Sequence, residues 1–162
     1  MFSSHMANKG LVLPLRLMIG FGFAAHGYAK PHRGPDKFAV ILASLGVPLP
    51  HLTAWVTSFV EFFGGISIMA GAFVLPLTLP LAVIMVTALF TVHLRYGFSS
   101  VTLKAVTSSG AQFGPVGYEL NLLYIAGLLT LAASGAGKPS VDQWLHRRKS
   151  PSNRRTPEAG RE

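Results

Sequence analysis

Four stretches of mostly apolar residues dominate the chain, and each is about as long as a bilayer-spanning helix. A helix needs roughly 20 apolar residues to cross the hydrocarbon core of a membrane. The stretches cover residues 11–29, 52–74, 76–97 and 117–135. We therefore predict an all-α polytopic membrane protein, a four-transmembrane-helix antiparallel bundle in which only a tight turn at Leu75-Pro76 separates the second and third spans.

The two longer connections carry different patterns. In the first, Phe38, Ile41, Leu42 and Leu45 follow the i, i+3, i+4, i+7 spacing of one apolar helix face. This predicts a short amphipathic helix that lies in the membrane interface or folds over the bundle, although an ordinary amphipathic connector fits the pattern equally well. The second connection, 98–116, is a polar loop rich in Ser and Gly, and its sequence specifies its structure only loosely.

The distribution of charge divides the chain into three parts. Only 12% of residues are charged, against about 25% in soluble domains. Seven of the fourteen Lys and Arg residues follow Gly135, which predicts that both ends face the cytoplasm. We divide the chain into an N-terminal segment (1–10), a membrane domain (11–142) and a basic, disordered tail (143–162) that sets orientation and also has the charge to contact anionic lipids.

A carboxylate, Glu61, stands in the middle of the apolar stretch "FVEFFGGISIMAG". Ionisable residues at membrane depth cost about 2.5–3.5 kcal/mol and normally face the interior of a bundle, where they pair. Gly64 and Gly65 remove side-chain bulk beside it, so a neighbouring helix can approach closely. We predict that Glu61 points inward and pairs with Arg16 of the first span. Such a pair either serves chemistry or only locks the bundle.

Other polar side chains fall near the outer ends of the four spans when depth is counted at 1.5 Å per residue. This group is predicted to surround a cleft open to the outside of the cell. Its members are His26, Lys30, His93, Arg95, Glu119 and Asn121.

Three segments resemble the DoxX family of four-helix membrane proteins. They are "RLMIGFGFAAHGYAK", "VEFFGGISIMAG" and "GYELNLLYIAGLLTLAASGAGKPSVD". The resemblance implies a bundle in a prokaryotic inner membrane and a link to quinone-coupled redox chemistry, as in a thiosulfate:quinone oxidoreductase. The positions at which this sequence matches the motifs of the family are Arg16, His26, Lys30, Glu61, Gly65, Glu119 and Asp142.

The resemblance favours an oxidoreductase subunit that binds quinone or quinol in the outer half of the bundle. Glu61, His26 and His93 would be the catalytic residues. Gly64, Gly65 and Asp142 would be structural. The substrate- or quinone-binding residues would be Arg16, Lys30, Arg95, Glu119 and Tyr96.

Quinone is the expected cofactor, and no metal is predicted. A haem between His26 and His93 fits their common depth, but hydrogen-bonded histidines are the commoner arrangement. The chain contains no cysteine, which excludes thiolate-held clusters and covalently attached haem. Electrons would therefore come from a soluble or membrane redox partner subunit.

Two other functions fit the same residues. One is a scaffold or assembly factor of a membrane complex, whose polar core only fixes the bundle. The other is a carrier of small anions or lipids, in which His26, Lys30, His93 and Arg95 form a cationic mouth. The expected partners are membrane lipids and a second copy of the chain, and no nucleic acid.

Overall fold

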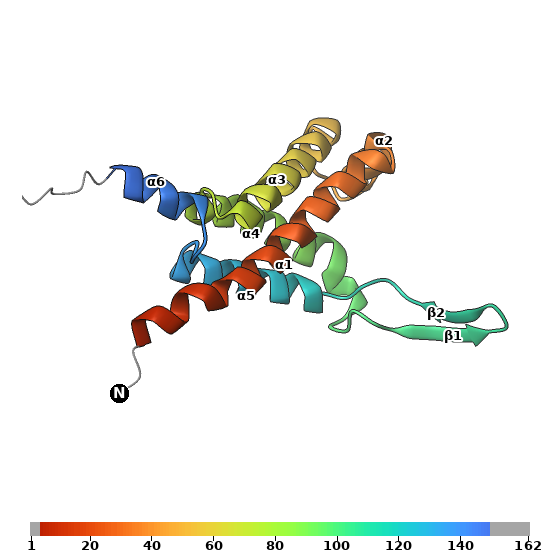
Figure 1. Ribbon diagram of the computed structural model, residues 1–162. Helices are drawn as coiled ribbons and strands as arrows, with labels where there is room; N and C mark the ends of the chain where they lie inside the picture. The colour runs from red at the N-terminus through yellow and green to blue at the C-terminus, as the bar shows by residue number, and fades with distance from the viewer. Residues whose placement is uncertain (1–3, 150–162) are drawn as a thin grey trace, which may run out of the picture.

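The computed structural model describes residues 4–149, which are mostly helical (Figure 1). The order of elements is α1 (Ser4–His32), α2 (Pro35–Ser44), α3 (Pro50–Ala70), α4 (Val74–Ala88), a π turn η1 (Leu89–His93), a 3₁₀ turn η2 (Leu94–Tyr96), β1 (Leu103–Thr107), β2 (Gly110–Phe113), α5 (Glu119–Ser134) and α6 (Val141–Lys149).

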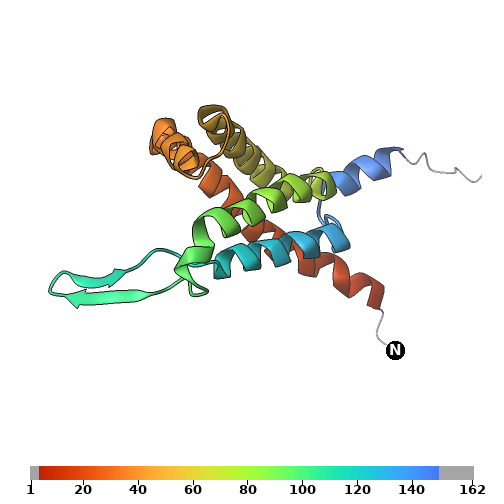
Figure 2. The same ribbon diagram turned by 180° about the vertical axis from the view of Figure 1, so that it is seen from behind.

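The long helices form two antiparallel pairs, α1 with α3 and α4 with α5, and the pairs cross each other (Figures 1 and 2). The start of α1 and helix α6 lie at one end of the molecule, which we call the α6 end. Helix α2 and the β1–β2 hairpin lie at the other, the hairpin end. This places both long connections of the chain opposite its two described ends.

The core lies where the two pairs meet. Its side chains are apolar and almost free of solvent, with Ile68, Leu81 and Leu131 all at 0% exposure. Phe23 of α1 and Leu128 of α5 complete it.

Glycine lets α1 and α3 approach until their backbones touch. A Cβ added to Gly65 of α3 would lie 2.5 Å from Gly20 O and 2.5 Å from Ala24 N. One added to Gly27 of α1 would lie 2.4 Å from Phe62 N. This is the small-residue packing of membrane helices, and it fixes the register of α1 against α3.

Two helices of the described chain are long and apolar enough to cross a membrane, Pro50–Ala70 and Val74–Tyr96. The four predicted spans all contain a helix, but the other two differ from expectation. Helix α5 has 16 residues, about 24 Å of rise, which is shorter than a typical hydrocarbon core. Helix α1 is 29 residues long and carries Arg16 and Lys30 in its sequence.

The outward face of α3 is apolar and aromatic. Trp55, Phe59 and Phe63 stack on one another along it, with centroid distances of 5.7 and 5.9 Å. All three are exposed, while Ser58, Glu61 and Gly65 on the opposite face are buried. The predicted division of α3 into a lipid-facing and an inward face is therefore present.

The 98–116 connection, which the sequence specifies only loosely, contains a short β-hairpin. Strands β1 and β2 pair in antiparallel register, Val106 with Ala111 and Thr107 with Gly110. Gly110 has φ +118, a backbone conformation that favours glycine and suits a tight hairpin turn. The tail also begins as a helix, since α6 extends to Lys149. Residues 150–162 of the predicted disordered tail lie outside the described residues.

Asp142, at the start of α6, caps α4 from a distant part of the chain. Its carboxylate accepts hydrogen bonds from Phe73 N (2.8 Å) and Val74 N (3.2 Å). Its own N–H donates to Gly71 O at 2.9 Å. Because the first N–H groups of a helix have no partner within the helix, Asp142 satisfies donors that no side chain of α4 reaches.

We expect Asp142→Ala to lower the free energy of unfolding by about 1–2 kcal/mol, the usual cost of losing an N-cap. Thermal unfolding of the purified protein in detergent would measure this. Asp36→Ala is the matched control, because the Asp36 side chain is 85% exposed, and its effect should stay within about 0.5 kcal/mol. Equal effects of the two substitutions would contradict the capping role.

Candidate functional site

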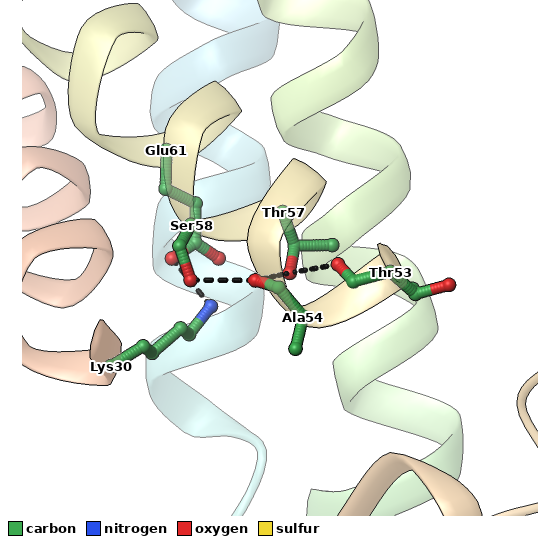
Figure 3. A network of polar contacts seen from close by, with 6 residues as sticks. All are labelled: Lys30, Thr53, Ala54, Thr57, Ser58 and Glu61. Atoms are coloured by element: carbon green, nitrogen blue, oxygen red, sulfur yellow. Dashed lines mark hydrogen bonds and ion pairs between the residues drawn. The ribbon is translucent and has the colours of Figure 1, made fainter. Parts of the chain in front are cut away.

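Glu61 is buried in the bundle and forms an ion pair with Lys30. The Lys30 Nζ lies 2.5 Å from Glu61 Oε2 (Figure 3). The Glu61 side chain is 2% exposed and that of Lys30 is 22% exposed. The inward orientation predicted for Glu61 is therefore confirmed, and its counter-charge comes from the last turns of α1.

The surroundings of the pair come from three helices. From α2, the Phe38 ring lies 4.7 Å from Lys30 Nζ in a cation–π arrangement. On α3, Ser58 is one turn before Glu61 and is also buried, and its hydroxyl donates to Ala54 O (Figure 3). The charges are thus covered by an aromatic ring on one side and by packed helix backbone on the other, which strengthens their attraction.

The predicted pairing of Glu61 with Arg16 is wrong. In the observed register Gly27 faces Ser58 and Gly20 faces Gly65, so Arg16 is displaced from Glu61 by about 12 Å of helix rise. Side chains also lean toward the N-terminus of their own helix. In this antiparallel pair, Lys30 and Glu61 therefore lean toward each other, whereas Arg16 leans away.

Arg16 instead holds the connection between α5 and α6. Its Nη1 donates to Ala136 O, and its Nη2 donates to Pro139 O at 2.6 Å. The residue is 2% exposed, and its Nε has no hydrogen-bond partner among the described residues. A Cβ on Gly71 would lie 2.6 Å from Nη1, so this position at the end of α3 must be small.

His26 lies on the flank of α1 beside α5. It is exposed at the surface of the bundle, and its ring is 6.5 Å from that of Tyr124. The Tyr124 hydroxyl fits over Gly22, where a Cβ would come within 1.7 Å of it. Tyr124 was not singled out from the sequence. In the sequence, the glycine one turn before His26 indicates that a large side chain of another helix packs against α1 at this position.

The remaining predicted site residues lie apart from the Lys30–Glu61 pair and bond mainly to the main chain. His93 Nδ1 lies 2.8 Å from Val116 O, and Glu119 accepts from Ser100 N at 3.0 Å. Asn121 donates to Met85 O at 3.3 Å. Arg95 and Tyr96 are exposed and stack on each other.

The side chains predicted to surround one cleft therefore form two separate groups in the structure. The first is Lys30–Glu61 between α1 and α3, with His26 and Tyr124 nearby on α1 and α5. The second surrounds the α4–α5 connection. Arg16 and Asp142, which were not assigned to the cleft, lie at the α6 end. Within residues 4–149, no three His, Asp or Glu side chains gather in the manner of metal ligands.

Comparison with known proteins supports the family assignment. The sequence model of the family described as DoxX matches residues 11–94, which is more than half of the 162 residues. No curated protein and no solved structure matches the chain. The match includes α3 with its Gly64-Gly65 pair, and both members of the Lys30–Glu61 pair. This chain belongs to the DoxX family of membrane proteins.

Proposed function

We propose that the protein is a multi-pass subunit of a prokaryotic inner membrane that binds quinone or quinol and takes part in quinone-linked redox chemistry. Helices α1, α3 and α5, and α4 with its two terminal turns, would form the four spans, and α2 would lie at the outer interface. Both ends would face the cytoplasm, since seven of the fourteen Lys and Arg residues follow Gly135.

The buried Lys30–Glu61 pair carries the proposal. Reduction of a quinone consumes two protons with two electrons, and oxidation of a quinol releases them. A buried carboxylate that is paired with an ammonium group offers a proton acceptor in a mostly apolar part of the bundle. Lys30 is also one helical turn from His26 in the sequence, so the exposed imidazole belongs to the same part of α1.

His26 and Tyr124 indicate where on the bundle the quinone ring would bind. An imidazole and a phenol at a lipid-facing flank have no water to bond, and a quinone or quinol would supply oxygen atoms as partners. Quinones enter from the membrane, which matches a site on the flank between α1 and α5. In quinol oxidation His26 would accept one of the two protons and the Glu61 carboxylate the other, both protons would leave toward the hairpin end, and the two electrons would go to a redox partner subunit.

A scaffold or assembly role is the second candidate. This role is favoured by the number of polar side chains that form hydrogen bonds with backbone groups of the bundle. Arg16, Asp142, His93, Glu119 and Asn121 each bond to a backbone group. In that case Lys30–Glu61 would lock α1 to α3 and nothing more.

Quinone content of the purified protein separates the two functions. We expect quinone to co-purify, and His26→Ala to reduce its amount by about tenfold or more through loss of a direct hydrogen bond. His51→Ala is the control, because His51 is a 70% exposed side chain on α3. Thermal unfolding of each variant verifies that the bundle is intact. If no quinone is found, or if His26→Ala retains as much as His51→Ala, the redox function is excluded and the scaffold is favoured.

A further inference from the structure

A cavity of about 650 Å³ opens at the α6 end, far from the Lys30–Glu61 pair. Its walls are the start of α4, the connection that follows α5, and α6. We propose that this cavity binds an anionic phospholipid of the adjoining leaflet, with the phosphate at Lys138 and the acyl chains along α4. The proposal depends on the chain being embedded in a membrane and is independent of the quinone site.

The α4 side of the cavity is apolar. Phe73 and Leu75 are each 63% exposed there, and Pro76 also lines the wall. These residues begin a helix that is long and apolar enough to cross a membrane. The wall thus continues into the lipid-facing surface of α4, and an acyl chain lying on it would cover side chains that a water-soluble ligand would leave exposed.

The opposite side of the cavity carries one cation, Lys138. This lysine makes no hydrogen bond or ion pair with another residue in the described part of the chain. The one carboxylate in the lining, Asp142, already accepts two hydrogen bonds from the start of α4. The Asp142 carboxylate is thus held by those two N–H groups, which leaves Lys138 as the charged group of the lining that is available to an anion.

Further positive charge follows immediately in the chain. The last turn of α6 carries Arg147, Arg148 and Lys149 in sequence, beside a single acid at the start of that helix. Basic pockets next to membrane helices on the cytoplasmic side are typical binding places for anionic headgroups. The charge of this end is thus complementary to a headgroup with a net negative charge, more than to a zwitterionic headgroup, whose own cation offsets its phosphate.

Arg16 positions the loop that bears Lys138. Its guanidinium bonds to Ala136 O and Pro139 O, the carbonyls on either side of that lysine. It also lines a second cavity of about 400 Å³, which shares Ser140 with the first. A buried cation of α1 thereby fixes the direction from which Lys138 meets the headgroup.

Native mass spectrometry of the full-length protein in detergent would test this with phosphatidylglycerol and with phosphatidylcholine of the same acyl chains. We expect phosphatidylglycerol to bind at least tenfold more tightly. Lys138→Gln should weaken its binding about fivefold, the effect of one cation near a membrane surface, and Lys138→Arg should retain it. Lys104→Gln, on the exposed hairpin at the other end, should leave binding unchanged.

Three results would overturn the proposal. The first is equal binding of the two lipids, and the second is unchanged phosphatidylglycerol binding in Lys138→Gln. The third is a matching loss in Lys104→Gln, which would show only a general charge effect. A competition experiment with inorganic phosphate distinguishes a lipid site from a site for a free anion. If phosphate displaces phosphatidylglycerol at millimolar concentration, the cavity binds a free anion and the lipid proposal is wrong. None of these results depends on whether quinone co-purifies, so failure here leaves the proposed function untouched.

Discussion

Gly65→Ala is expected to destabilise the protein by about 3 kcal/mol, although it adds a single methyl group. The new Cβ would meet the backbone of α1 at 2.5 Å, at both Gly20 O and Ala24 N. Backbone atoms cannot rotate away, so α1 and α3 would have to separate, which places this substitution at the upper end of overpacking costs. Thermal or denaturant unfolding in detergent would measure the loss.

The neighbouring glycine is the matched control. A Cβ on Gly64 would lie 3.5 Å from the Leu81 side chain, which is an ordinary van der Waals contact. Alanine also favours a helix over glycine by roughly 0.5–1 kcal/mol. Gly64→Ala should therefore be neutral or slightly stabilising. A similar loss of stability in both variants would contradict the α1–α3 packing described here.

The second large effect on stability is expected from breaking the Lys30–Glu61 pair. The loss of stability should differ according to which of the two residues is replaced. Lys30→Met leaves the carboxylate of Glu61, 2% exposed, without a counter-charge, and should cost about 3–5 kcal/mol. Glu61→Gln leaves an amine whose side chain is 22% exposed and can reach water more easily. We expect a smaller cost there, about 2 kcal/mol.

The double variant Lys30→Met/Glu61→Gln should be more stable than Lys30→Met alone, because it removes the unpaired charge as well as the pair. The measurement is the unfolding free energy of all three variants in the same detergent. Equal losses in the two single variants would indicate that both groups reach water, and would contradict the buried geometry.

The sequence predicts the helices and the direction of Glu61 well, because both follow from local pattern. The Trp55, Phe59 and Phe63 stripe and the Ser58, Glu61 and Gly65 face alternate with helical period, so one side of α3 had to face inward. The family motifs lie on the same helices. These features need no knowledge of how the helices pack.

The partners of the buried charges could not be predicted in the same way. Depth counting placed Arg16 about 8 Å below Glu61, with His26 and His93 about as far above it, and so favoured Arg16 over Lys30. Only the register fixed by Gly20, Gly27 and Gly65 identifies Lys30 as the partner. The role of Asp142 depends on a contact 69 residues away in the chain. The β1–β2 hairpin was missed because its strands are short and wholly exposed, so no buried face marks them in the sequence.

A pair of double-mutant cycles tests most directly whether Lys30, and not Arg16, is the buried partner of Glu61. The first cycle combines Lys30→Met with Glu61→Gln, and the second combines Arg16→Met with Glu61→Gln, with unfolding free energy as the readout. We expect a coupling of about 2–3 kcal/mol in the first cycle and no more than about 0.5 kcal/mol in the second. A large coupling to Arg16, or none to Lys30, would contradict the Lys30–Glu61 pairing.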